Sequence, residues 1–198
     1  MGFREALINR RSIYAIGKDR VLGKEKVEGI VKDGILHIPS PFNVQSNRAV
    51  VLFGEKSDEF WDKLIEIMKG MLSPDRFPAT EEKLLGFKAG YGTVLFFIDD
   101  AAINELKDKF PLYAHNFTPW SEHSQGMLQY YIWAGLEAEG LGANLQHYNE
   151  LVEEFVKEKY PIKEGWRLTA QMPFGKALEK AGEKEFLPIE ETFVSLGE

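Results

Sequence analysis

The chain has 198 residues, of which 44% are hydrophobic, and its formal net charge is −7. This length and composition fit one globular domain spanning residues 1–198, and the acidic charge excludes nucleic acid as an expected partner because phosphate backbones are repelled. The complete absence of cysteine excludes disulfides, thiolate nucleophiles and cysteine-ligated metals.

The first half of the chain contains two helical patterns and one apolar run. Apolar residues at helical spacing predict helices over 2–10 and 24–37. Residues 48–54 include the run Ala-Val-Val-Leu-Phe, which predicts a strand buried on both faces. Ser57 is expected to cap the helix that follows it, and a further helix is predicted over 80–87.

The strongest strand signal lies at 92–98, where Thr-Val-Leu-Phe-Phe combines β-branched and aromatic residues. Asp99 and Asp100 follow directly. They could be paired catalytic carboxylates, but they are better explained as the cap of a helix that runs to Lys109. The remaining elements are predicted as a helix over 120–139, a short strand over 143–146, a helix over 149–159 and a strand over 165–173. Strands and helices alternate, so the sequence predicts an α+β or α/β fold.

The helix predicted over 120–139 is apolar around more than half of its circumference. Its apolar residues are Met127, Leu128, Tyr130, Tyr131, Ile132, Trp133 and Leu136. A helix of this kind has to be buried on most sides. Two explanations stay open: the helix packs at a subunit interface, or it lies in the centre of a monomer core.

Several signals of well-known protein classes are missing. No stretch reaches the ~18 apolar residues that a membrane-spanning helix needs, and the first residues contain no apolar signal core, so we expect a cytoplasmic protein with no membrane partner. The motifs Gly-Tyr-Gly at 90–92 and Gly-Leu-Gly at 140–142 lack the third glycine of a dinucleotide-binding turn. The absence of a Gly-x-Ser-x-Gly elbow argues against a hydrolase. The four histidines never stand four residues apart, so we predict no metal site.

Two cations and a hydroxyl follow the first predicted helix, at Arg10, Arg11 and Ser12. Arginine donates hydrogen bonds in a planar fork and serine adds a short donor, and this combination suits a phosphate. Taken alone, the same arginines are better explained by the carboxyl end of a helix, whose dipole favours positive charge.

An amide-rich loop, 39–48, connects a predicted helix to a predicted strand. Asn43 and Gln45 offer both donors and acceptors, which matches the mixed edge of a heteroaromatic ring such as the flavin pyrimidine. A simple polar turn is the alternative. Later in the chain, backbone amides after 140–142 could meet a ring, and 183–188 supplies a late cation.

Four segments in this order resemble the FMN-dependent nitroreductases, from about residue 8 to residue 194. They are Arg-Arg-Ser at 10–12, Pro-Ser-x-x-Asn-x-Gln at 39–45, Gly-Leu-Gly at 140–142 and the lysine at 184 that precedes Leu-Pro. Within this family, the stretches at 10–15, 90–97 and 143–149 are similar to a short subgroup of fungal and lactic-acid-bacterial proteins that includes the fatty-acid-repression-mutant type.

The resemblance implies an α+β fold of three layers, with a central mixed or antiparallel sheet flanked by helices, and an intertwined homodimer with two FMN sites at its interface. By position, the residues implied for the FMN phosphate and ribityl chain are Arg10, Ser12 and Lys184, with Arg11 close by. The residues implied to reach the flavin from the other subunit are Pro39, Ser40, Asn43 and Gln45. The residues implied to line the ring near N5, largely through their backbone, are Leu145, Gln146 and His147.

The resemblance also implies the chemistry: NAD(P)H passes hydride to flavin N5 and leaves before a nitroaromatic or quinone-like acceptor enters, which predicts ping-pong kinetics. A role in oxidative or xenobiotic stress defence is a further expectation. The flavin carries the reaction, so no catalytic side chain is required, and His147 is either a proton donor or a structural residue. Phe110, Tyr113, Phe117 and Trp120 either wall the acceptor pocket or belong to the core. A flavin-binding redox or lipid-linked regulator with little turnover is the alternative function.

Three positions depart from the family pattern. Tyr14 stands where many members have a lysine beside the flavin pyrimidine, which removes one cation that would stabilise the reduced flavin. Lys184 is followed by Glu185 and Phe186 instead of a second basic residue. Gln-His-Tyr at 146–148 replaces the usual Gly-Gly or Glu-Gly near N5.

Overall fold

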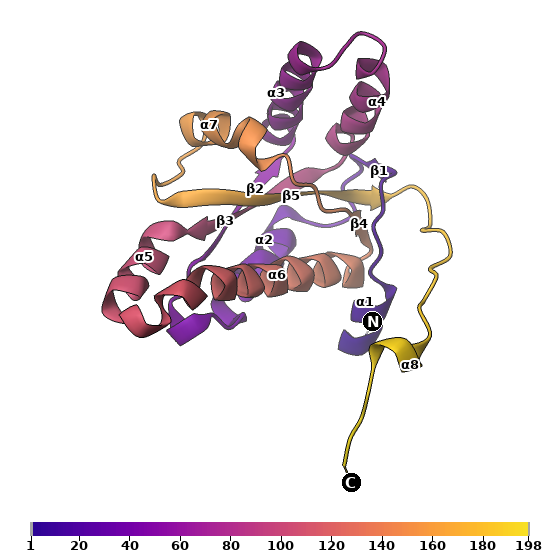
Figure 1. Cartoon of the computed structure of the whole chain (residues 1–198). Coiled ribbons are helices and arrows are strands. Elements are labelled where there is room, and N and C mark those ends of the chain that lie inside the picture. Colours follow the sequence, from indigo (N-terminus) through magenta and orange to yellow (C-terminus); the bar gives the residue numbers. More distant parts are fainter. Residues whose placement is uncertain (1, 198) are drawn as a thin grey trace.

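The computed structural model describes residues 2–197 and has a sheet as its middle layer (Figure 1). Five strands pair antiparallel in the order β1–β5–β3–β2, with β4 added alongside β5. The strands are β1 (Ile16–Gly17), β2 (Asn47–Phe53), β3 (Gly92–Asp99), β4 (Leu141–Ala143) and β5 (Trp166–Ala177). Strand β2 is therefore an edge of the sheet.

Helices cover both faces of this sheet (Figure 1). One face packs against α3 (Glu55–Met71), α4 (Phe77–Lys88) and α7 (Asn149–Lys159). On the other side lie α2 (Lys24–His37), α5 (Asp100–Lys109) and the long α6 (Ala114–Ala138). The predicted α+β fold, a central sheet with helices on both sides, is confirmed.

Strand β3 lies between β2 and β5, and it is buried along its whole length except at Asp99. Successive side chains of a strand point to opposite faces. Val94 and Phe96 therefore join the core that includes α2 and α6, whereas Leu95 and Phe97 join the core that includes α3, α4 and α7. This burial on two sides is the reason for the continuous apolar run in the sequence.

Helices α2 and α6 approach each other closely at two glycines. A Cβ on Gly34 would lie 2.8 Å from Cδ1 of Leu128, and a Cβ on Gly135 would lie 2.6 Å from Cγ2 of Ile30. Each glycine thus leaves room for an apolar side chain of the other helix. This packing fixes α6, the helix along which the candidate site is arranged.

Most predicted elements are present within a few residues of their predicted bounds, including α1 (Phe3–Asn9). Asp99 caps α5 as predicted, because its carboxylate accepts a hydrogen bond of 3.2 Å from the N–H of Ala102. The prediction that Ser57 caps α3 is wrong. The helix begins after Gly54, and the buried Ser57 hydroxyl lies 2.8 Å from the hydroxyl of Thr93 in β3.

Two regions differ more from the prediction. Helix α6 begins at Ala114 and runs through Pro119, although the helix was predicted only from residue 120. A proline near the amino end of a long helix removes only one backbone donor. The strand predicted over 143–146 is β4, which ends at Ala143, and Gln146 forms a single bridge to Gln171.

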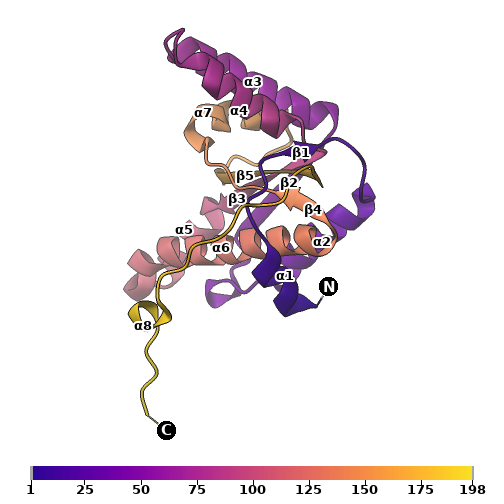
Figure 2. The same ribbon diagram turned by 90° about the vertical axis from the view of Figure 1, so that its right-hand side faces the viewer.

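After β5 the chain leaves the body of the molecule. Residues 178–197, which we call the tail, contain the short helix α8 (Ile189–Thr192) and run away from the sheet (Figures 1 and 2). The large apolar side chains exposed on the tail are Leu178, Phe186, Leu187, Ile189, Phe193, Val194 and Leu196. A segment this apolar needs another surface to cover it.

Candidate functional site

The residues after α1 and the start of the tail enclose a pocket of about 530 Å³, which we call the cationic pocket. Its lining residues include the cations Arg10, Arg11, Lys180 and Lys184, the acid Glu179, and Ser12 and Tyr14. Two backbone hydrogen bonds hold the two segments in place: Ile13 N–H donates to Ala143 at 2.9 Å, and Leu178 N–H donates to Ala15 at 2.9 Å. With four cations and one acid among its lining residues, the pocket carries an excess of positive charge, although the whole protein is acidic.

Two aromatic rings of α6 hold the Arg10 guanidinium. Its guanidinium carbon lies 4.3 Å from the ring centroid of Trp133 and 5.7 Å from that of Tyr130. Its Nε is buried and has no hydrogen-bond partner within residues 2–197. Glu137 lies nearby on α6: burial raises the pKa of this carboxyl, and the positive charge of Arg10 partly offsets the increase.

The cationic pocket brings together all four residues that the sequence predicted for a phosphate: Arg10, Arg11, Ser12 and Lys184. Planar guanidinium donors, an ammonium group and a hydroxyl are the groups that bind phosphate in proteins. Lys180 was not predicted. It has no motif around it, and only the pairing of the tail with residue 15 brings it into the pocket.

Residues 144–148 lie next to the same pocket. Ser12 forms a parallel bridge with Ala143, and the Asn144 side-chain amide donates to the Ile13 carbonyl at 2.8 Å. Leu145 is half-buried and His147 is exposed, which follows the alternation of an extended chain. Both can contact a ligand that extends out of the cationic pocket.

Gln146 points the other way and is buried. Its backbone N–H and carbonyl both bond to the backbone of Gln171, at 2.7 and 2.9 Å, and its side-chain amide donates to Asn144 at 2.8 Å. The side chain of Gln171 accepts a bond of 2.8 Å from Tyr148 N–H. This buried amide network supports residues 144–148 from the protein interior, and it could not be predicted from the sequence because its members lie far apart in the chain.

The loop 39–45 has a strained backbone around the short 3-10 turn η1 (Pro41–Asn43). Phe42, Asn43 and Gln45 have φ values of 51°, 52° and 50°, a region that residues other than glycine rarely occupy. The loop persists in this form because several bonds fix it. Gln45 N–H donates to the Ser40 hydroxyl at 2.8 Å, and the Arg48 guanidinium donates to the Gln45 carbonyl.

Phe42 anchors this loop in a group of aromatic rings. Its ring centroid lies 4.9 Å from that of Phe110, 5.4 Å from that of Phe117 and 6.1 Å from that of Tyr113. Phe117 is fully buried, whereas Phe42 and Tyr113 are partly exposed. Within the aromatic segment predicted from the sequence, Phe117 therefore belongs to the core and Tyr113 lies at the surface. Phe42 of the loop contacts both rings.

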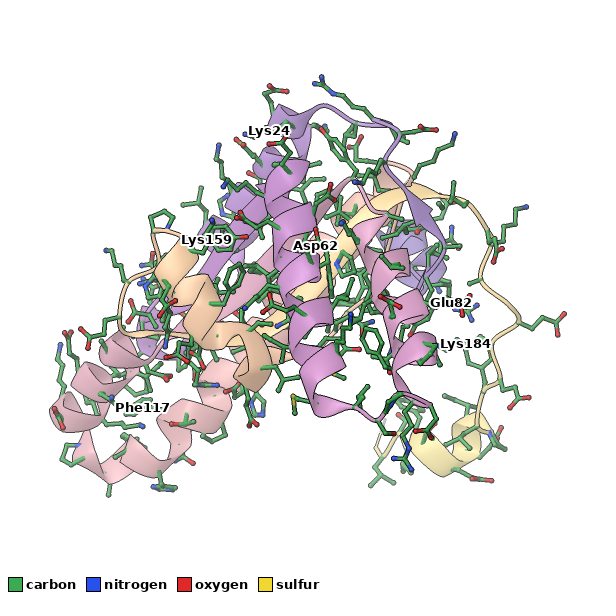
Figure 3. The ribbon with its side chains drawn as sticks, turned by 90° about the horizontal axis from the view of Figure 1, so that it is seen from above. Lys24, Asp62, Glu82, Phe117, Lys159 and Lys184 are labelled. Atoms are coloured by element: carbon green, nitrogen blue, oxygen red, sulfur yellow. The ribbon has the colours of Figure 1, made fainter. Side chains whose placement is uncertain are left out.

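Within one chain, the loop 39–45 and the cationic pocket lie at different places along α6. The Ser124 hydroxyl donates to the Pro39 carbonyl at 2.7 Å, whereas Trp133 contacts Arg10. These two α6 residues are nine positions apart, which is about 14 Å along a helix axis. Figure 3 shows Lys184 and Phe117, which mark the two regions, on opposite sides of the molecule. Asn43 and Gln45 are exposed and line no part of the cationic pocket.

Two other classes of site have no counterpart in the described chain. Within residues 2–197, no group of three or more histidine and acidic side chains could hold a metal ion. In the same range, no helix combines the length and the apolar character needed to cross a membrane.

Comparisons with known proteins agree with the sequence motifs. The profile described as the Nitroreductase family matches residues 7–176. The chain is 32% identical to the nitroreductase FRM2 of Saccharomyces cerevisiae over 187 residues, which is 93% of each chain. It is also similar to the nitroreductase CinD of Lactococcus lactis, which was solved with nicotinic acid (40% identity, TM-score 0.92, 99% of this chain and 100% of that chain) and with 4-nitrophenol (40% identity, TM-score 0.89, the same coverage). A structure from Desulfovibrio desulfuricans in complex with FMN shares the fold, with 19% identity, a TM-score of 0.69, and coverage of 100% of this chain and 98% of that chain.

Proposed function

Because the chain belongs to the nitroreductase family and is therefore an oxidoreductase, we propose that it uses FMN to transfer electrons from NAD(P)H to nitroaromatic or quinone-like acceptors. One observation carries this proposal. The cationic pocket gathers the predicted phosphate-binding residues next to the extended segment 144–148, whose exposed and half-buried side chains can lie along a flat ring.

The side chains of the cationic pocket fit the phosphate and ribityl chain of FMN. Arg10, Arg11 and Lys184 supply positive charge, and Ser12 supplies a hydroxyl. The buried Nε of Arg10, which has no acceptor in residues 2–197, is a donor suited to an anionic ligand.

Residues 144–148 are the part of the chain proposed to face the ring. Leu145 would contact it directly, Gln146 would hold the strand from inside, and His147 is the candidate to hold a proton near the acceptor. Bound FMN would supply the redox chemistry by accepting hydride from NAD(P)H at N5 and passing it to the acceptor in ping-pong order.

The proposed functional unit is a homodimer. The apolar tail is exposed, and β2 has no second neighbour strand within residues 2–197. Two apolar grooves lie open on the surface: one between β2 and α2, lined by Val31, Ile35 and Val51, and one between α1 and α6. A second copy of this chain offers matching apolar surfaces, and it would also bring its loop 39–45, with Pro39, Ser40, Asn43 and Gln45, to a site from which that loop is absent in a single chain.

The acceptor class is supported by a relative: CinD of Lactococcus lactis was solved with 4-nitrophenol. The exposed rings of Phe42 and Tyr113 are the parts of this chain proposed to contact such a flat compound. A role in stress defence and a cytoplasmic location remain predictions from the sequence.

The experiment that tests the proposed function is spectroscopic and kinetic. Purified protein should be yellow or should take up added FMN, with absorbance that bleaches when NAD(P)H is added without oxygen. It should then oxidise NAD(P)H when a nitroaromatic such as 4-nitroquinoline oxide is supplied. A colourless protein that does not bind added FMN would contradict the proposal.

The same measurement separates the enzyme from the alternative, a flavin-binding regulator. An enzyme gives a rate clearly above that of the same concentration of free FMN. Protein that is replete with flavin but no faster than free FMN would favour the regulator.

A further inference from the structure

Trp133 occupies an unusual position between α6 and the residues that follow α1. Its ring face lies under the Arg10 guanidinium at 4.3 Å, and its indole Nε1 donates to the Ala143 carbonyl at 3.2 Å. The same carbonyl accepts the bond from Ile13 N–H at 2.9 Å. Trp133 therefore contacts the side chain of Arg10 and shares the Ala143 carbonyl with the backbone N–H of Ile13.

The stacking contact decides where the charge of Arg10 is held. Arginine has a long side chain with many rotamers, so a guanidinium left in solvent occupies one position only part of the time. The π face of tryptophan attracts a cation more strongly than that of any other aromatic residue. Because Nε of Arg10 has no hydrogen-bond partner in residues 2–197, this contact with the ring is the interaction that orients the guanidinium.

The neighbouring residues of α6 support this arrangement. Tyr130, one turn earlier, adds a second ring at 5.7 Å from the guanidinium carbon, and its hydroxyl donates to the Leu7 carbonyl at 2.9 Å. Glu137, one turn later, brings a carboxyl close enough for Arg10 to lower its pKa against the effect of burial. Trp133 lies between them at the shortest distance from the cation.

We infer that Trp133 is a positioning residue for the phosphate group of the bound cofactor, acting through Arg10, whose guanidinium it holds at the wall of the cationic pocket. The inference depends on the proposed function, because it assumes that FMN is the ligand of this pocket. It gives Trp133 a larger effect on phosphate recognition than on ring recognition, because the indole reaches residues 144–148 only through its bond to the Ala143 carbonyl.

The test compares two ligands that differ only in the phosphate, FMN and riboflavin, on the full-length protein after its flavin has been removed. Trp133→Leu should raise the Kd for FMN about tenfold, an effect between those of an exposed and a desolvated cation–π contact. The Kd for riboflavin should stay within about twofold, since riboflavin has no phosphate to meet Arg10. Trp133→Phe keeps a weaker ring and loses the indole donor, so it should lower the preference for FMN over riboflavin about threefold.

Trp166→Leu is the matched control, because Trp166 also lies under a guanidinium, with the Arg48 carbon 5.5 Å from its ring centroid, and it does not line the cationic pocket. It should leave the preference for FMN unchanged. Equal weakening of FMN and riboflavin by Trp133→Leu, or no weakening of either, would overturn the inference. If Trp133→Leu does not fold, Trp133→Phe decides, and an unchanged preference in that variant overturns the inference. A wild-type protein that binds neither ligand contradicts the proposed function itself.

Discussion

The cationic pocket and the loop 39–45 recognise a ligand in opposite ways. The pocket places long charged side chains on an unstrained backbone, and its lysines are exposed. The loop holds its amides on a backbone with left-handed φ values at Phe42, Asn43 and Gln45, which cost about 1–3 kcal/mol each. The cations of the pocket can bind any phosphate group that comes within reach. The strained loop holds its amides in fixed positions, so it can recognise only a ligand of matching shape.

The two regions also differ in how complete they are within one chain. The cationic pocket contains every residue predicted for the phosphate. The loop is bonded to Ser124, about 14 Å along α6 from Trp133, and it shares no pocket with Arg10. This separation supports a site shared between two subunits, with the phosphate held by one copy and the ring approached by the loop of the other.

The largest expected effect comes from mixing two variants that each damage one region. Arg10→Ala should weaken FMN binding about 100-fold, because a charged hydrogen-bond donor is lost. The double variant Asn43→Ala with Gln45→Ala should weaken it about tenfold. When the two proteins are unfolded and refolded together, about a quarter of all sites should regain wild-type affinity, since each mixed dimer contains one intact site. The measurement is an FMN titration of the mixture.

Arg4→Ala is the control for this experiment, because Arg4 is an exposed arginine of α1 that does not line the cationic pocket. It should bind FMN like the wild type. No recovery in the mixture, while light scattering shows dimers, would mean that each loop acts on the site of its own chain. A protein that stays monomeric at all concentrations would contradict the shared site altogether.

An intermediate effect is expected for the anchor of the strained loop. Phe42→Ala removes the contacts with Phe110, Phe117 and Tyr113, so the amides of the loop should become disordered. FMN and riboflavin should both bind about tenfold more weakly, because the loop approaches the ring and not the phosphate. Calorimetric titration with both ligands measures this.

Leu112→Ala, at an exposed position of the neighbouring turn η2 (Pro111–Tyr113), is the control and should change neither affinity. A loss confined to FMN would show that the loop senses the phosphate. That result would remove the distinction between the two regions.

The difference between the regions also explains what could be predicted from the sequence. Strands and helices could be predicted because burial leaves an apolar pattern in the chain, such as the continuous apolar run of β3. Arg10 to Ser12 stood out as three adjacent polar residues, and the resemblance to the nitroreductases assigned them to a phosphate. The loop was recognised from its amides. Its left-handed backbone was not predicted, because phenylalanine, which occupies position 42, rarely adopts a positive φ.

The contacts that were missed join residues distant in sequence. Trp133 meets Arg10, Gln171 supports residues 146 and 148, and Lys180 enters the cationic pocket only because the tail pairs with residue 15. The apolar residues around α6 left two explanations open, a subunit interface or the core of a monomer. A single chain buries only some of these residues, among them Leu128 and Ile132. Met127 and Tyr130 instead line an open groove.

The smallest effect is expected for a substitution of Glu137, next to the cationic pocket. Its effect on the free energy of unfolding should depend on pH, whereas that of a substitution in the loop 39–45 should not. Burial raises the pKa of this carboxyl above its ordinary value of 4.5, with Arg10 partly opposing the shift. The folded chain therefore holds the proton more tightly than the unfolded chain, and the stabilisation this gives is present in acid and is lost as the pH rises through the raised pKa. Glu137→Gln removes this dependence, so the variant should gain stability relative to the wild type as the pH rises above the ordinary pKa of 4.5, by a few tenths of a kcal/mol because solvent screens the group. Urea unfolding of the flavin-free proteins at several pH values measures the gain. The cost of Phe42→Ala should not vary over this range, because the contacts that anchor that ring are with other aromatic rings and not with a carboxyl. A Glu137→Gln difference that is equally flat with pH would show that the carboxyl is already solvated in the folded chain.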